Sequence, residues 1–235
     1  MKKRILSTLL LALFAAGSVQ AIPLSALFQG ASITAGDKLF DRWSLGLYDT
    51  SNPLRSLNAA NIEVTALNDG GLNPGPGLSF TVINNELGIF GDGTFAYIDL
   101  KFGFHASVLV PGLAIKDNSL VLTSGQISLS GDNGFYIRET IGTVAGASDL
   151  GTKKVEFSFL DPNLISDLSD SAVFAPNREI WVTKNILVWA TNDIEFANLT
   201  GFEQRFSQVA IPEPATLALT MLALAGVGLS RRKAS

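Results

Sequence analysis

The chain has 235 residues, 47% of them hydrophobic, and contains no cysteine. It therefore has no disulfide, no thiol nucleophile and no cysteine-bound zinc or iron–sulfur site. The formal net charge is −4, but six of the 17 basic residues lie in residues 1–4 and 231–233, and Glu213 is the one acid outside residues 22–211. Residues 22–211 thus hold 11 basic and 20 acidic residues, a net charge of −9. Such a body repels nucleic acid, and no motif indicates a cofactor.

The first 21 residues have the pattern of a secretory signal peptide. Residues 2–4 are Lys-Lys-Arg, and residues 5–16 form an apolar stretch too short to span a membrane. Residues 19–21, Val-Gln-Ala, offer suitable −3 and −1 positions for a signal peptidase. We therefore expect cleavage after Ala21 and export of the chain from residue 22 onward.

Residues 22–211 have the periodicity of β-strands. In residues 96–110 apolar side chains occupy the even positions and mainly polar ones the odd positions. This alternation places the apolar and the polar side chains on opposite faces of one strand. Similar patterns occur at 153–159 and 180–188, and weaker ones at 125–130 and 202–209. The shared phase predicts a common core made of Ile98, Leu100, Phe102, Phe104, Val108, Val155, Phe157, Phe159, Ile180, Val182, Ile186 and Val188.

Turn-forming residues lie between these strands, at 68–71, 73–77, Asp92-Gly93 and Asn133-Gly134. No Pro/Ser-rich linker divides the body, so we expect a single domain over residues 22–211. Because each sheet must bury its apolar face, the predicted fold is an all-β, antiparallel β-sandwich of the jelly-roll type. A β-barrel is the alternative. Between the targeting segments, only a short helical turn near 164–168 is expected.

His105 is the only histidine, and it lies on the polar face of the 96–110 strand. A Ser-His-Asp triad needs one histidine, but the chain has no G-x-S-x-G nucleophile elbow. Zinc sites usually combine several histidine or cysteine ligands. We therefore assign no catalytic residue. A secreted glycoside hydrolase, which needs two carboxylates across a groove, is the most remote alternative.

Four oxygen-bearing side chains, Asp161, Asn163, Asp167 and Asp170, fall within ten residues. They are weak candidates for a calcium site, because their spacing does not match the twelve-residue EF-hand loop. We interpret them as acidic turn residues and predict no resident metal.

Trp181 and Trp189 are both at odd positions of the strand around 180–188, so they share one face of it. The opposite face holds the even positions Ile180, Val182, Ile186 and Val188. If the aliphatic face is the core, both indoles point outward and offer a face on which a glycan can stack. The competing interpretation places them beneath a neighbouring loop or sheet, because large aromatic side chains are mostly buried.

The C-terminal region has three parts. Pro212-Glu213-Pro214 leads into the uncharged run 215–229, and Arg231-Arg232-Lys233 lies beyond it. The prolines keep the preceding backbone extended, so a helix is expected to begin near Ala215. Its 15 residues span about 22 Å, against about 30 Å for a bilayer core, which predicts a marginal, transient transmembrane helix. The basic cluster acts as a stop-transfer signal and leaves the body outside the cytoplasm.

This order of Pro-Glu-Pro, apolar helix and basic end resembles the PEP-CTERM sorting signal of exported proteins in Gram-negative bacteria that make exopolysaccharide. Ser32–Phe40, Leu168–Pro176 and Glu203–Gln208 also resemble segments of a body found on such proteins, one without an assigned activity. The resemblance implies an exosortase-type processing enzyme as partner and residues 212–235 as the sorting signal.

From this resemblance we expect a non-catalytic protein, exported as an inner-membrane-anchored precursor and then placed at the cell surface or in the extracellular matrix. The resemblance also implies an association with exopolysaccharide or biofilm. The alternative is a carbohydrate-binding or adhesive module using the Trp181 and Trp189 face.

Overall fold

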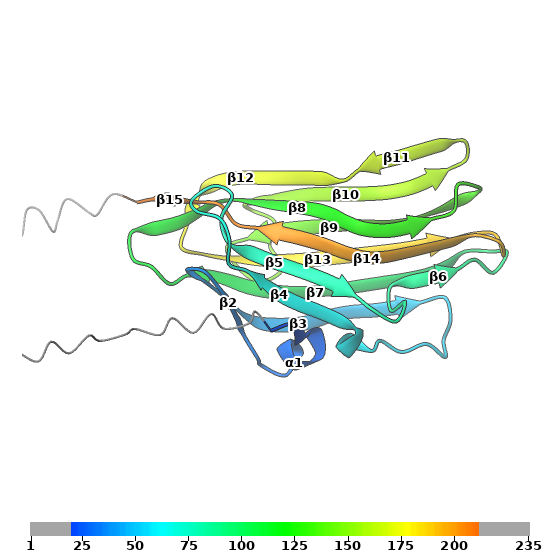
Figure 1. Cartoon of the computed structure of the whole chain (residues 1–235), viewed down its shortest axis with the longest axis horizontal. Coiled ribbons are helices and arrows are strands. Elements are labelled where there is room, and N and C mark those ends of the chain that lie inside the picture. The colour runs from blue at the N-terminus through cyan, green and yellow to red at the C-terminus, as the bar shows by residue number, and fades with distance from the viewer. Residues whose placement is uncertain (1–19, 212–235) are drawn as a thin grey trace, which may run out of the picture.

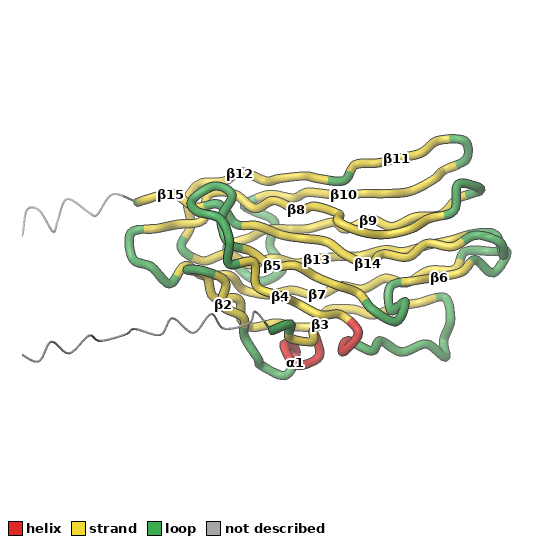
Figure 2. Tube along the Cα trace, in the orientation of Figure 1, coloured by secondary structure: helices red, strands yellow, loops and turns green. Residues whose placement is uncertain are grey.

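The computed structural model describes residues 20–211. Two antiparallel sheets lie face to face with their strands along the long axis of the molecule (Figure 1). Within the described residues the sheets stay open, so the body is a β-sandwich and the barrel alternative is wrong. The helical elements of this part are α1 (Leu24–Phe28) and η1 (Ala59–Asn61), and strands make up most of the remainder (Figure 2).

One sheet has eight strands, ordered β1-β4-β5-β14-β8-β12, with β15 also paired to β8 and β6 to β14. Their bounds are β1 Ile22–Pro23, β4 Ile62–Leu67, β5 Gly77–Val82, β6 Gly88–Phe90, β8 Leu113–Ile127, β12 Ser169–Asn177, β14 Phe196–Arg205 and β15 Gln208–Ala210.

The other sheet has seven strands, ordered β11-β10-β9-β13-β7-β3-β2. Their bounds are β2 Ile33–Ala35, β3 Lys38–Thr50, β7 Ala96–Val108, β9 Asp132–Gly142, β10 Gly151–Leu160, β11 Asn163–Asp167 and β13 Glu179–Ala190. The three strands with the clearest predicted alternation, β7, β10 and β13, all belong to this sheet. Within it, β13 pairs with both β7 and β9.

The core lies between the sheets and follows the predicted phase. Ten of the twelve predicted core residues are buried, whereas Phe157 and Phe159 are half-buried. Aromatic rings from both sheets meet there. Trp43 stacks on Phe104 with ring centroids 4.4 Å apart, and Phe80 stacks on Phe202 at the same separation.

Two local predictions are wrong. Residues 164–168 do not form a helical turn, because Asn163–Asp167 is the edge strand β11, paired with β10. Asn133-Gly134 is not a turn, since β9 begins at Asp132 and the positive φ of 61° falls on Gly131. In both cases pairing with β10 supplies backbone partners that a local turn would have left unused.

Candidate functional site

The described chain starts and stops close to the predicted targeting segments. β1 begins at Ile22, directly after the predicted cleavage position Ala21. At the other end, Ile211 N donates to Gly112 O at 2.7 Å, so backbone pairing continues to the residue before Pro212. Pro212, Glu213, Pro214, Arg231, Arg232, Lys233 and the predicted transmembrane helix lie outside the described residues. Among residues 20–211 no helix is long and apolar enough to cross a bilayer.

His105 is the centre of a cluster on the outer face of the seven-stranded sheet. The register aligns Asp41, His105 and Trp181 in one row across β3, β7 and β13. His105 Nδ1 lies 2.8 Å from Asp41 Oδ1, and its Nε2 lies 3.3 Å from Glu179 Oε2. Both ring nitrogens are therefore engaged by carboxylates, which fixes the imidazole although it lies on the outer face.

Trp181 covers this histidine and remains half-exposed. Its ring centroid is 5.1 Å from that of His105, and Arg42 Cζ lies 5.8 Å from the Trp181 ring, within cation–π range. Arg42 has a φ of 52°, unusual for a non-glycine residue, where the β3 register shifts. The side chains of Asp41 and Glu179 are 29% and 69% exposed. The arrangement offers an aromatic plane bordered by a cation and two acceptors.

Trp189 also faces outward, as its parity predicts, but it belongs to a separate cluster. Only 7% of it is exposed, and its ring lies 6.1 Å from that of Tyr136, above which lies Lys154 Nζ at 4.9 Å. Eight residues along β13 separate the two indoles by about 26 Å in an extended strand. The two tryptophans therefore share a face but do not share a site.

The structure does not bring the four weak calcium candidates together. Asp161 and Asn163 lie at the β10–β11 connection, and Asp167 lies at the far end of β11. Asp170 belongs to β12 in the other sheet, where its Oδ2 accepts from Lys154 N at 2.8 Å. No group of three or more histidine, aspartate or glutamate side chains that could hold a metal occurs within residues 20–211.

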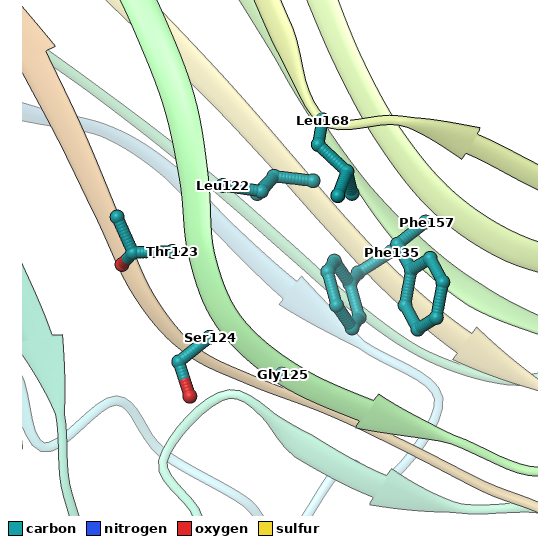
Figure 3. Close-up of a pocket in the computed structure, with 7 residues that line it drawn as sticks. All are labelled: Leu122, Thr123, Ser124, Gly125, Phe135, Phe157 and Leu168. Carbon is teal, nitrogen blue, oxygen red and sulfur yellow. The ribbon is translucent and has the colours of Figure 1, made fainter.

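A small cavity opens where the two sheets part near β10. It has a volume of about 200 Å³ and is lined by Leu122, Thr123, Ser124, Gly125, Phe135, Phe157 and Leu168 (Figure 3). Typical small-molecule sites are about 300–1,000 Å³. We interpret this cavity as the reason that Phe157 is only half-buried, and we assign it no ligand.

A charged cluster in the core escaped the sequence analysis. Glu139 and Lys184 are fully buried cross-strand partners on β9 and β13, and Lys184 Nζ contacts Glu139 Oε1. Lys153 Nζ on β10 lies 2.8 Å from Glu139 Oε2, without the alignment of a hydrogen bond. From the facing sheet, Gln204 Nε2 donates to the same Oε2 at 3.2 Å. The only signal in the sequence was charged or amide residues at apolar positions of their strands.

Burial lowers the pKa of both lysines well below the ordinary value, and for Lys184 it is the sole cause. For Lys153 the charges of Asp170 and then Asp117 raise the pKa against this effect. Two ammonium groups on one buried carboxylate would leave a net positive charge in the core, which is costly. Burial therefore disfavours the charged form of both lysines.

Among known proteins, a family match is found for the C-terminal region of the chain. Residues 210–233 match the family described as the PEP-CTERM protein-sorting motif. No curated protein sequence matches the chain. The chain therefore carries a PEP-CTERM sorting signal, joined to an all-β sandwich, and it is an exported protein.

Two solved structures are distantly similar to the body. One is TmCBM61 in complex with β-1,4-galactotriose, 12% identical with a TM-score of 0.27 over 72% of this chain and 88% of that chain. The other is endoglucanase 3 of Trichoderma harzianum from family GH12, 10% identical with a TM-score of 0.22 over 71% and 97%. Scores this low carry no argument about the present protein.

Proposed function

We propose that this protein is a non-catalytic component of the cell envelope or the extracellular polysaccharide matrix, released there by an exosortase-type enzyme acting at Pro212-Glu213-Pro214. The observation that carries the proposal is the match of residues 210–233 to the PEP-CTERM motif. The fold is compatible with it, because the last residue that the structure describes, Ile211, is still hydrogen-bonded to the body and lies before the motif. A cut at the motif would leave the described sandwich, residues 20–211, intact.

The proposed processing also has a physical basis in the sequence. A protease or transpeptidase binds extended backbone, whose amides are not already paired within a helix. The sequence predicts that Pro212 and Pro214 keep this stretch extended, and Glu213 adds a charge that distinguishes it from an ordinary proline-rich linker. The short apolar run 215–229 suits a temporary anchor.

The test is the mature C-terminus, read by mass spectrometry in producing cells with and without the processing enzyme. We expect enzyme-containing cells to lack Arg231-Arg232-Lys233 and enzyme-free cells to retain it in the membrane fraction. Mature protein that keeps these residues in enzyme-containing cells would make the tail a plain anchor and refute the processing step.

A second candidate function is glycan binding on the outer face at Trp181. The supporting observation is a half-exposed indole bordered by Arg42, Asp41 and Glu179, since ligand sites typically combine aromatic surface with a few placed polar groups. The test is affinity electrophoresis through gels containing the polysaccharide of the producing cells. Trp181→Ala should weaken retardation by at least about tenfold, or about 1.4 kcal/mol.

Phe90→Ala is the matched control, because Phe90 is 72% exposed and lies on β6 of the opposite sheet. It should migrate like the unmodified protein. Absence of retardation of the unmodified protein, or equal loss in both variants, would remove the glycan site from consideration while leaving export untouched.

A further inference from the structure

The Glu139 cluster joins the two sheets through a single carboxylate. Lys184, on β13 of the seven-stranded sheet, reaches Oε1, and Gln204, on β14 of the eight-stranded sheet, donates to Oε2. All three side chains are fully buried. A primary amine and a carboxamide thus lie on neighbouring oxygens of one acid, in a place that bulk water does not reach.

Two aromatic rings and the Glu139 carboxyl group surround the amine of Lys184. Lys184 Nζ lies 5.3 Å from the centroid of the Phe80 ring and 5.1 Å from that of Phe202. This burial lowers the pKa of Lys184 well below the ordinary lysine value. A deprotonated lysine is a nucleophile, and burial in an apolar pocket is one way in which proteins activate it.

The carboxamide of Gln204 is only partly hydrogen-bonded. Gln204 Nε2 is held by Glu139, but its Oε1 is buried without a hydrogen-bond partner within the described residues. A buried amide oxygen without a donor is unfavourable in a resting core. The same oxygen is the one that gains negative charge when a nucleophile adds to Cδ.

We propose that Lys184 and Gln204 form an intramolecular amide cross-link between the two sheets, with Glu139 transferring the proton. The Nζ–Cδ bond forms and the Cδ–Nε2 bond breaks. Glu139 takes a proton from Nζ and delivers it to Nε2, which leaves as ammonia, so Glu139 ends unchanged. All reacting groups belong to this chain, and the exchange of one amide for another needs no oxidant or external co-reactant.

Two other pairings fit less well. Direct attack on Glu139 would consume the group that transfers the proton, and a carboxyl group without activation is a poor electrophile for an amine. Asn118 is also buried on β8, but neither of its amide atoms is hydrogen-bonded within the described residues, so nothing there holds it on the proton-transferring group. Gln204 is the amide that Glu139 orients.

The cross-link would give this exported protein a covalent connection that its sequence otherwise lacks. The chain contains no cysteine, so no disulfide can join the sheets. An amide formed in the core would connect β13 to β14 and would not depend on the redox state outside the cell.

Peptide mapping of the purified full-length chain tests the proposal. After denaturation and trypsin digestion, we expect a branched peptide joining the segments that contain Lys184 and Gln204, lighter than their sum by one ammonia. Cleavage after Lys184 should be lost, because trypsin does not cut at an acylated lysine. A normal peptide ending at Lys184 with an intact Gln204 peptide would overturn the proposal without any variant.

Variants assign the roles. In Lys184→Arg, the peptide containing Gln204 should keep its full mass, because no ammonia is lost. In Glu139→Gln, both peptides should be found unlinked. Lys101→Arg, on the exposed face of β7, is the matched control and should keep the cross-link. Loss of water with a Lys184–Glu139 link, a link to Asn118, or a link that persists in Glu139→Gln would each refute the assignment. If a variant does not fold, the peptide map of the unmodified chain still tests the proposal.

Discussion

At the scale of single residues, the outer face and the core use polar groups in different ways. His105 lies on the outer face and is held by Asp41 and Glu179, whose carboxylates remain partly in water. Glu139 and Lys184 lie in the core, where water does not solvate their polar groups. Removing one partner should therefore be far more costly in the core than on the face.

Phe102 provides the residue-scale test of the core. It is fully buried on β7, beside the Trp43 and Phe80 rings. Phe102→Ala should lower the free energy of unfolding by about 3–5 kcal/mol, because it removes apolar contacts and leaves a cavity. Urea denaturation measures this. Phe90→Ala, at 72% exposure, should change stability by less than about 0.5 kcal/mol. Equal losses would contradict the assigned core.

Asp149 provides a residue-scale test of pH dependence. Its carboxylate accepts from Thr143 N at 2.9 Å and from Thr143 Oγ1 at 2.8 Å, and these bonds lower the pKa of Asp149 below 3.8. A lowered folded pKa gives stability that is fully present above the unfolded value and is lost as the pH falls through the folded pKa. Asp149→Asn should destabilise the protein at neutral pH and approach the unmodified protein in strong acid. A difference that grows in acid would refute this.

At the scale of elements, the β9–β10 pair shows why individual glycines matter. A Cβ atom on Gly134 would lie 2.3 Å from Ser158 Cβ, across the pair. Gly134→Ala should therefore force the strands apart and cost on the order of 1–3 kcal/mol in unfolding free energy.

Gly71→Ala is the control for that substitution, because a Cβ atom there would meet nothing within 4 Å and its φ is not positive. Its midpoint in urea should stay close to that of the unmodified protein. If both alanine variants unfold at the same denaturant concentration, close packing of β9 against β10 is not what requires glycine.

At the scale of the whole molecule, the extended strand β11 separates acidic residues that sequence proximity had grouped. Asp161 and Asn163 lie at the β10–β11 connection, whereas Asp167 lies at the other end of β11, opposite Glu156. Calcium should therefore leave the melting temperature unchanged, because a ligand stabilises a protein only by binding its folded state. Differential scanning fluorimetry with and without calcium measures this. A clear rise that Asp167→Ala abolishes would show that the prediction is wrong.

Sequence alone determined the features that depend on local order. The sorting signal is a contiguous string, and period-two alternation in 96–110 and 180–188 correctly assigned the buried faces of β7 and β13, because a strand fixes which side chains share a face. It left open whether Trp181 and Trp189 are exposed, and in the structure Trp181 is half-exposed whereas Trp189 is 7% exposed. It failed at Asn133-Gly134 and 164–168, where pairing with β10 decided the conformation.

Only the tertiary structure decided which strands are neighbours. Asp41, His105 and Trp181 meet because β7 lies between β3 and β13, and Glu139 meets Gln204 because β9 and β14 face each other across the core. These partners are far apart in the chain, and their contact depends on strand order and register, which alternation leaves open. For the same reason, alternation places Lys184 on the buried face of β13, but it does not show which acid and which amide lie beside it there.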